Sequence, residues 1–326
     1  MDGFKIYGNE ASLSKLSSMI KKDRIMPSIL ICGEKGLGKT CMAEYIAAAI
    51  NCERHEGVPC GVCRSCQMTL HKNHPDVIYV KATSAQGNYR VKEDIRPMIA
   101  DSYIAPNEQG RKIYIIDNGE KLNEVCQNAL LKVFEEPPGE SVFILTAENK
   151  QTILPTVLSR VFAFELKRVS EDDAYSALTD MGISPDDAKK AQEAFPGNIG
   201  MQIEYLNGGK VFDSVVLARN IISSLNAGSE YELLKTLTEL SNRDTAMSVA
   251  ELVCEILSRA AESADGAEAL LSCDNAGADE LASKVDPVKI ARLYDSFTSF
   301  GQRVRGFANL TVSTAALCAE ISEMFF

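Results

Sequence analysis

The sequence has no long apolar run and no excess of positive charge. None of its apolar stretches approaches the roughly 20 residues of a membrane-spanning helix. The first residues, MDGFKIYGNE, have neither the basic nor the apolar segment of a secretory signal. Among the 326 residues, 34 Lys and Arg stand against 45 Asp and Glu, a formal net charge of −11. Because such a surface repels phosphate backbones, binding to DNA by charge alone is disfavoured. We expect a cytoplasmic protein with no membrane partner.

Disulfides are not expected in the reducing cytoplasm, yet the chain has ten cysteines. Six are scattered, mostly within apolar stretches, and we expect all six to be small buried hydrophobic residues. These six are Cys32, Cys41, Cys126, Cys254, Cys273 and Cys318.

The other four cysteines form a cluster with the spacing C-x7-C-x2-C-x2-C. They are Cys52, Cys60, Cys63 and Cys66. Four thiolates that converge in this way are typical of a structural zinc site, with disulfides and a redox role as the alternatives. We therefore expect a structural Zn²⁺ in a module over residues 52–66. The three histidines nearby are expected at the surface or as capping residues rather than as ligands. They are His55, His71 and His74.

Residues 1–165 alternate short apolar strands with helical patterns, which indicates a parallel sheet flanked by helices. The strand candidates are Ser28–Cys32, Val77–Val80, Lys112–Asp117, Val142–Thr146 and Phe162–Glu165. Helical patterns include Lys39–Ile50 and a segment from about Asn123 to Glu136, which Pro137 and Pro138 stop.

After Glu165 the strand signals end and the periodicity is helical. A stretch from Ala261 to Lys284, rich in Ala, Asp, Glu and Ser, is predicted to be a weak helix plus a loop. The fold class predicted is therefore an α/β domain over residues 1–166, a small helical domain over 167–208 and a helical bundle over 209–326.

The segment Gly33–Thr40 fits the P-loop pattern G-x-x-x-x-G-K-[ST], since it follows a predicted strand and opens a predicted helix. Gly33, Gly36 and Gly38 allow the backbone N–H groups to turn toward phosphate. Lys39 is expected to reach the β- and γ-phosphates and Thr40 to hold Mg²⁺. The alternative is a loop that keeps this shape without binding nucleotide.

The predicted strand over 112–117 ends in Asp117, where an aspartate can act on a Mg²⁺-bound water. The residue that follows it in working ATPases of this type is a glutamate, and here it is Asn118. Because an amide cannot accept a proton as a carboxylate does, we expect ATP to bind at this site but to be hydrolysed poorly. Glu120 could take the place of the missing glutamate only if the chain made an unusual turn after Asp117.

Several segments resemble the clamp-loader subunits of bacterial DNA polymerase III, most closely their delta-prime group. They include the P-loop followed by the four-cysteine module, the sequence HPDV from His74, and the strand end at Asp117. The stretch NALLKVFEEPP from Asn128 is similar to the family's N-A-L-L-K-x-L-E-E-P-P, and LPTVLSR, ending at Arg160, is similar to its L-P-T-x-x-S-R-C. Residues 303–317 resemble its last helices. The resemblance covers most of the chain.

This resemblance implies a P-loop domain of the AAA+ type, a helical lid and a helical collar that joins five subunits into a ring. The expected partners are the gamma/tau and delta subunits and, through the complex, the sliding clamp and primed DNA. Arg160 matches the arginine that reaches into the ATP site of the neighbouring subunit. The cysteine after it is replaced by Val161. The alternative role for Arg160 is a salt bridge to a local carboxylate such as Glu165.

Three features favour the delta-prime group over the ATP-hydrolysing gamma/tau subunit. Asp117 is not followed by the glutamate that the motor subunits have. The lid segment over 197–202 has no arginine where the motor has one, and the chain ends at Phe326 without the long extension typical of tau. Own ATPase activity is therefore doubtful, and a gamma/tau-type motor is the alternative. A free-standing P-loop phosphotransferase is disfavoured, because it explains neither the cysteine module nor the helical C-terminal third.

Overall fold

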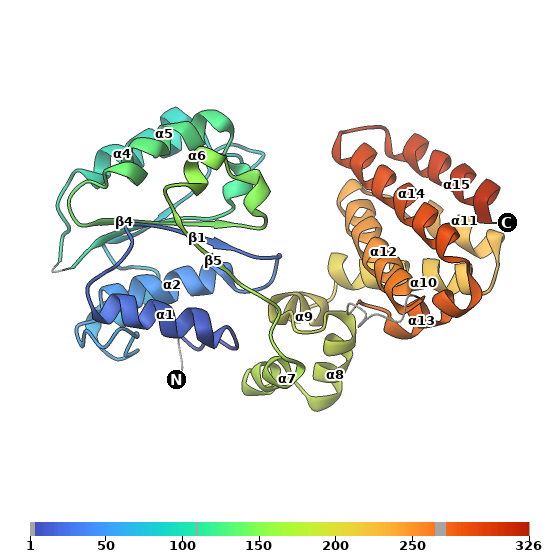
Figure 1. Ribbon diagram of the computed structural model, residues 1–326, viewed down its shortest axis with the longest axis horizontal. Coiled ribbons are helices and arrows are strands. Elements are labelled where there is room, and N and C mark those ends of the chain that lie inside the picture. The colour runs from blue at the N-terminus through green and yellow to red at the C-terminus, as the bar shows by residue number, and fades with distance from the viewer. Residues whose placement is uncertain (1–3, 109, 265–271, 326) are drawn as a thin grey trace. The chain divides into compact units, whose positions relative to one another are not determined.

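The computed structural model describes residues 4–108, 110–264 and 272–325. The chain divides into two compact units, residues 1–169 and 170–326 (Figure 1). The first unit contains all the strands that the structure describes, and the second is helical.

The first unit is built on a five-stranded parallel sheet in the order β2-β3-β4-β1-β5. The strands are β1 (Ser28–Cys32), β2 (Val77–Val80), β3 (Lys112–Ile116), β4 (Ser141–Ala147) and β5 (Phe162–Glu165). The three central strands, β1, β3 and β4, are buried along their whole length, which is why they have almost unbroken apolar sequences. The predicted strands are confirmed; β3 ends one residue earlier than expected, and β4 is one residue longer at each end.

Helices cover both faces of this sheet (Figure 1). On one face lie α1 (Glu10–Lys21) and α2 (Lys39–Ile50), with α3 (Arg64–Leu70) beside α2; on the other lie α4 (Arg96–Ser102), α5 (Glu124–Glu135) and α6 (Pro155–Leu158). A π-helical turn over Val91–Ile95 leads into α4, and short 3-10 turns cover Gly119–Lys121 and Lys150–Thr152. Each face has its own apolar core, so the sheet is buried on both sides.

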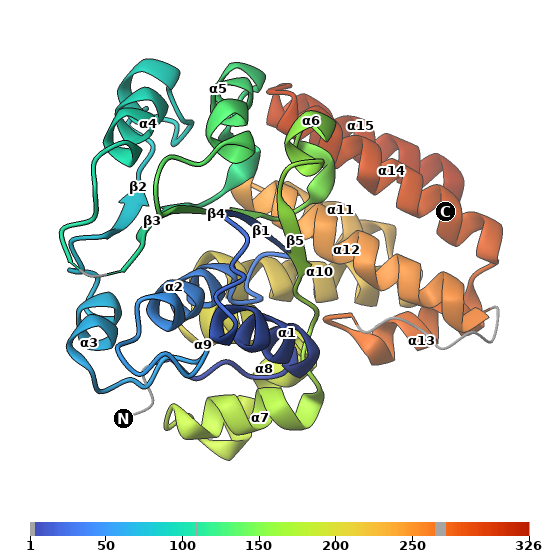
Figure 2. The ribbon, with the colours of Figure 1, turned by 60° about the vertical axis from the view of Figure 1, so that its left-hand side comes forward.

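Strands β2 and β5 form the two edges of the sheet (Figure 2). Because all five strands are parallel, their carboxyl ends lie along one side, where ligands bind in open α/β sheets. The P-loop follows β1 at this side, and Asp117 follows β3. Strand β4, which separates β1 from β3, ends there at Thr146 and Ala147.

The second unit consists of nine helices among its described residues. They are α7 (Glu171–Asp180), α8 (Pro185–Ala194), α9 (Ile199–Leu206), α10 (Lys210–Asn226), α11 (Glu230–Thr238), α12 (Arg243–Ala264), α13 (Asn275–Lys284), α14 (Pro287–Arg305) and α15 (Leu310–Phe325). Side-chain oxygens cap several N-termini, as at Ser170, Ser184 and Asn198. The helical prediction after Glu165 is confirmed, while the domain border at residue 209 stays a prediction.

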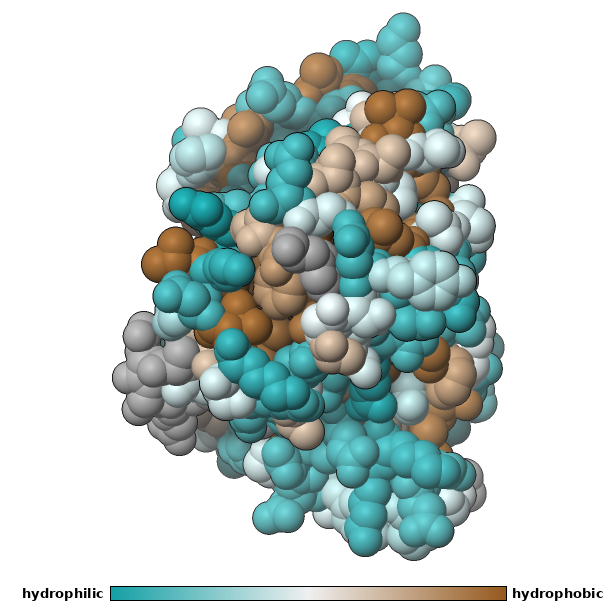
Figure 3. Space-filling view, turned by 90° about the vertical axis from the view of Figure 1, so that its right-hand side faces the viewer, coloured by the Kyte–Doolittle hydropathy of each residue, from teal (hydrophilic) through white to brown (hydrophobic). Residues whose placement is uncertain are grey.

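The predicted weak helix and loop over 261–284 falls partly outside the described residues. Residues 265–271 are not described; α12 ends before them and α13 follows them. Within the described ranges, no helix is both long and apolar enough to cross a membrane. The face drawn in Figure 3 mixes polar and apolar side chains in small groups. Exposed apolar side chains of the second unit include Tyr231, Phe307 and Val312.

One buried carboxylate organises the loop between α4 and β3. Asp76, only 1% exposed, accepts hydrogen bonds from the backbone amides of Asn107 and Glu108, at 2.7 Å and 2.9 Å. The amide nitrogen of the Asn107 side chain donates a third bond, at 2.9 Å. The backbone carbonyl of Asp76 also accepts from the N–H of Ile113, at the start of β3.

We expect Asp76→Ala to lower the free energy of unfolding of the first unit by about 2–4 kcal/mol, because two backbone amides lose a buried, charged acceptor. Hydrogen exchange of the Asn107 and Glu108 amides should become faster by the same free energy. Asp295→Ala, at an exposed position of α14, is the control and should change stability by less than about 0.5 kcal/mol. Unchanged protection of both amides in Asp76→Ala would contradict this account.

Candidate functional site

The P-loop turns tightly between β1 and α2. Gly38, the N-cap of α2, has φ +80°, and Gly36 has φ +87°, both in the left-handed region that favours glycine. At Gly33 a Cβ atom would lie 2.9 Å from the backbone oxygen of Leu166, so a side chain does not fit there. The loop therefore brings the N-terminus of α2, with its unpaired N–H groups and partial positive charge, to the carboxyl end of β1.

Lys39 lies at the first position of α2 and extends back along this loop. Its Nζ donates hydrogen bonds to the backbone oxygens of Gly33 at 2.7 Å and Glu34 at 2.8 Å. Burial lowers the pKa of Lys39, although Glu148 and Glu120 oppose that shift. The carboxylate of Glu34 pairs with Arg168 at 2.9 Å. The P-loop lysine therefore lies within the loop whose glycines were predicted to surround phosphate.

The carboxylate of Asp117 joins three elements at the carboxyl side of the sheet. Its Oδ1 accepts from the hydroxyl of Thr40 on α2 at 3.2 Å and from the hydroxyl of Thr146 on β4 at 2.9 Å. The same Thr146 oxygen accepts from the backbone N–H of Asn118 at 3.1 Å. Thr40 and Asp117 were both predicted to bind the nucleotide and its magnesium ion. They are 77 positions apart in the chain, and the fold brings them together.

Sequence reasoning missed Thr146, which was expected only as the end of a strand. The signal was a lone hydroxyl in the otherwise apolar sequence SVFILTA. Its side chain is buried, and both its hydrogen bonds go to the Asp117–Asn118 segment. A buried hydroxyl needs such partners, so a polar residue at the carboxyl end of a central strand can indicate a site.

Asn118 and Glu120 lie directly after Asp117. Asn118 has φ +57° and starts the 3-10 turn that contains Glu120. The carboxylate of Glu120 accepts from the backbone N–H of Glu148 at 3.3 Å, which ties it to the end of β4. Glu120 is therefore engaged with its neighbouring strand, and the position after Asp117 holds an amide.

The residues present fit a nucleotide with its magnesium ion. Left-handed glycines at a helix N-terminus suit phosphate oxygens, and Lys39 supplies a positive charge beside them. The Thr40 hydroxyl and the Asp117 carboxylate are the oxygen ligands that Mg²⁺ prefers. When bound, the nucleotide would supply a phosphate group for transfer to water. This chain has no carboxylate directly after Asp117 to accept a proton from that water.

The four predicted cysteine ligands come together in the structure. The Sγ atoms of Cys52, Cys60, Cys63 and Cys66 all lie within 4.8 Å of one another. A tetrahedral zinc ion with Zn–S bonds of about 2.3 Å requires sulfur atoms about 3.8 Å apart, so the cluster is close to the needed size. Backbone amides already donate to two of the sulfurs, Cys63 N to Cys60 Sγ and Cys66 N to Cys63 Sγ.

Two thiols of the cluster differ in their electrostatic surroundings. Desolvation acts to raise the pKa of Cys60, but hydrogen bonds from the backbone amides of Val62 and Cys63 outweigh it and lower the pKa to about 6. Burial raises the pKa of Cys66 well above its ordinary value.

The cluster is attached to the sheet through His74. This residue is buried, and burial lowers its pKa; of the two roles expected for it, surface residue or cap, its bond to a backbone N–H fits the cap. Its Nε2 lies 3.0 Å from the hydroxyl of Ser65 on α3, and its Nδ1 accepts from the backbone N–H of Asp76. His74 therefore connects α3, which carries Cys66, with the start of β2. It contributes no atom to the group of four sulfurs.

The prediction that the other six cysteines are all buried is wrong for Cys41. This residue is exposed on the first turn of α2, because the helix turns it away from the sheet. Cys254 and Cys318 are half-buried, and the remaining three are buried as expected.

Arg160 follows the short helix α6, on the connection between β4 and β5. Its side chain is 34% exposed and pairs with Glu135, the last residue of α5. The expected local partner, Glu165, is instead bound to Lys150 at 2.6 Å. The salt bridge thus exists, with a different carboxylate. Among the described residues, the hydrogen bonds of Arg160 go to Glu135, Thr156 and Ser159 rather than to Asp117.

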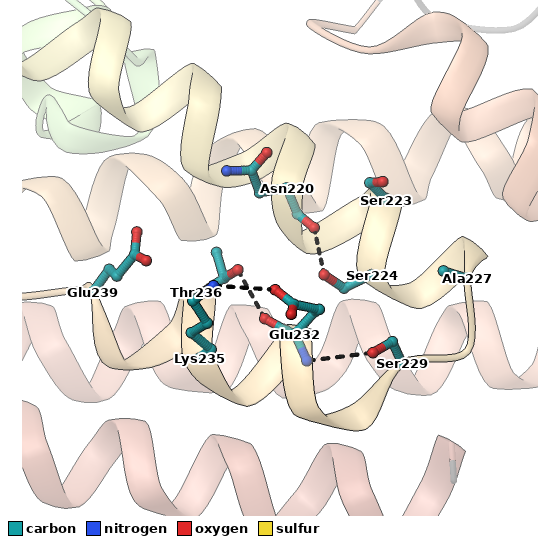
Figure 4. Close-up of a pocket in the computed structure, with 9 residues that line it drawn as sticks. All are labelled: Asn220, Ser223, Ser224, Ala227, Ser229, Glu232, Lys235, Thr236 and Glu239. Atoms are coloured by element: carbon teal, nitrogen blue, oxygen red, sulfur yellow. Dashed lines mark hydrogen bonds and ion pairs between the residues drawn. The ribbon is translucent and has the colours of Figure 1, made fainter.

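Two open hollows are also present among the described residues. One, of about 540 Å³, borders Asp117 and is lined by Lys72, Lys81 and Lys121, of which Lys72 pairs with Glu44 at 2.7 Å. The other, of about 310 Å³, lies between α10 and α11 (Figure 4). Two of its hydroxyls bond within their own helices, Ser224 to the Asn220 carbonyl and Thr236 to the Glu232 carbonyl. This second hollow shows no unsatisfied group that points to a ligand.

We expect the purified chain to hold about one zinc ion per monomer, measured by elemental analysis. Cys63→Ser should lose the metal and increase hydrogen exchange over residues 52–70 more than elsewhere, because metal binding energy is local folding energy. Cys254→Ser, outside the cluster, should keep the metal. A chain without metal whose four cysteines are paired as disulfides would contradict the zinc assignment.

Comparison with known proteins matches the first unit. A model of the family described as DNA polymerase III, delta subunit, covers residues 8–170. DNA polymerase III subunit tau of Escherichia coli (strain K12) is 35% identical over 164 residues, 50% of this chain and 25% of that protein. Subunit gamma of Buchnera aphidicola is 34% identical over 176 residues, 53% of this chain and 47% of that protein. The matched part of the chain thus spans a quarter to a half of these relatives.

A solved structure of a DNA polymerase III gamma subunit-related protein from Thermotoga maritima aligns over 96% of this chain and 99% of its own, with 16% identity and a TM-score of 0.46. That score is too low to support a conclusion. The family match, in contrast, covers half of the chain and contains the P-loop, the four cysteines and Arg160. The chain belongs to the DNA polymerase III delta-subunit family.

Proposed function

We propose that this chain is a delta-prime-type subunit of the DNA polymerase III clamp loader. In this role it joins the ring through its helical region over 209–326, with the helices over 167–208 as a lid. It supplies Arg160 to the ATP site of an adjacent gamma/tau subunit. With the delta subunit it helps to place the sliding clamp on primed DNA. Its own cofactors are a structural Zn²⁺ and, at the P-loop, ATP with Mg²⁺.

The observation that carries this proposal is Asn118 directly after Asp117. The phosphate-binding and magnesium-binding groups are present, with Thr40 bonded to Asp117, but the carboxylate that activates water is replaced by an amide. The 3-10 turn after Asn118 carries one acidic side chain, Glu120, and its carboxylate accepts a hydrogen bond from the backbone N–H of Glu148. A site that binds nucleotide without efficient hydrolysis suits a subunit that assists a neighbour.

A second candidate is a gamma/tau-type motor subunit. The observation in its favour is that the relatives with 34–35% identity are named subunits tau and gamma. The sequence over 197–202, GNIGMQ, lacks the arginine expected of a motor's lid, which disfavours this candidate.

Purified alone, the chain is expected to hydrolyse ATP negligibly, whether or not it binds it, because Asn118 cannot act as a base. The measurement is steady-state phosphate release with and without Lys39→Ala. Turnover of about 1 s⁻¹, typical of a working phosphoryl-transfer site, that disappears in Lys39→Ala would establish the motor alternative instead.

Arg160→Ala is expected to leave the chain folded and in its complex with the gamma/tau and delta subunits, but to slow ATP hydrolysis by the adjacent subunit. An arginine supplied in trans contributes about 10³–10⁵ in rate where it acts alone on one site. Clamp loading on primed DNA should fall as well. The rates are measured on the assembled complex.

Arg54→Ala is the matched control, since Arg54 is an exposed arginine of the same unit on the loop between two cluster cysteines. It should leave both rates unchanged. If the Arg160→Ala complex assembles and loads clamps as fast as the unmodified one, the role in trans is wrong and Arg160 serves only its contact with Glu135.

A further inference from the structure

The guanidinium of Arg160 is almost fully occupied by groups of its own chain. Its Nε and Nη2 both donate to Oε1 of Glu135. Its Nη1 donates to the backbone oxygen of Thr156 at 2.7 Å and to the hydroxyl of Ser159 at 3.0 Å. A guanidinium has five N–H donors, and four of them are used here. One donor is too few for the two-bond contact that arginine makes with a phosphate group.

Glu135 is held firmly opposite Arg160. It ends α5, and Pro137 and Pro138 follow directly. On the same helix, the side-chain nitrogen of Gln127 donates to the Thr152 carbonyl at 3.1 Å, and its oxygen accepts from the Leu154 N–H at 2.7 Å. These bonds attach α5 to the segment that leads into α6. The facing of Glu135 and Arg160 is therefore set by the packing of two elements.

The ion pair is nevertheless weak enough to exchange. The side chain of Arg160 is 34% exposed and that of Glu135 is 48% exposed. Exposed pairs of this kind change an equilibrium by about two- to fivefold. A phosphate group carries more negative charge and more acceptor oxygens than one carboxylate oxygen, so it can displace Glu135 from the Nε edge of the guanidinium.

We propose that Glu135 is a positioning residue that holds Arg160 on its own chain until the phosphate of the neighbouring ATP site takes the place of its carboxylate. This inference rests on the proposed role of Arg160 in trans. Arg160 must leave Glu135 before it can bind the phosphate, so the strength of this ion pair sets the free energy that the release requires. Removal of its charge lowers that requirement and leaves the arginine itself unchanged.

The test is Glu135→Gln in the complete complex with the gamma/tau and delta subunits, with ATP hydrolysis as the readout. The hydrolysis rate at the site that Arg160 serves is expected to rise about two- to fivefold. Glu136→Gln is the matched control, because it removes the same charge one position along the chain, and it should leave the rate unchanged. Thermal unfolding of each isolated chain shows whether either substitution disturbs the fold.

Both glutamates are also substituted in an Arg160→Ala background, where a residue that acts through Arg160 has no further effect. If Glu135→Gln still changes the rate in that background, it acts elsewhere and the inference is wrong. A rate equal to that of Glu136→Gln, or a lower one, in the presence of Arg160 also overturns it. If Arg160→Ala alone leaves hydrolysis unchanged, the proposed function fails first, so the two failures are distinguishable.

Discussion

The candidate site depends on one interaction centre, the carboxylate of Asp117 at the carboxyl side of the parallel sheet. It accepts from Thr40 at the start of α2 and from Thr146 at the end of β4, so one side chain at the end of β3 connects the helix after β1 with β4. This connection depends on all three strands running in the same direction, which brings their ends to one side of the sheet. A change in strand order or direction would separate the P-loop from its magnesium-binding partner.

The same sheet also positions the cysteine cluster and the Glu135–Arg160 pair, which lie on its opposite faces. On one face, α2 leads into the four-cysteine cluster, and His74 connects the cluster's helix α3 with the start of β2. On the other face, α5 and α6 place Glu135 against Arg160. The cysteine cluster has its own small core with Ala48 of α2 and is therefore part of the packing of the first unit.

Local sequence patterns were sufficient to predict the strands and the main helices of the first unit. Central strands buried on both faces have continuous apolar sequences, so Ser28–Cys32 and Lys112–Ile116 could be located to within a residue. The P-loop and the C-x7-C-x2-C-x2-C spacing are local as well, since the glycines and cysteines that define them are separated by few residues.

Contacts between distant residues were decided only by tertiary structure. The sequence by itself indicated that a local carboxylate could pair with Arg160, and the nearby Glu165 was the example expected. The fold instead brings Glu135, 25 positions earlier, to the guanidinium, because α5 and α6 pack on the same face of the sheet. Thr146 reaches Asp117 for a similar reason, since β4 is hydrogen-bonded between β1 and β3. Backbone preferences act over a few residues, whereas the neighbours of a side chain depend on strand order and on how helices pack across the sheet.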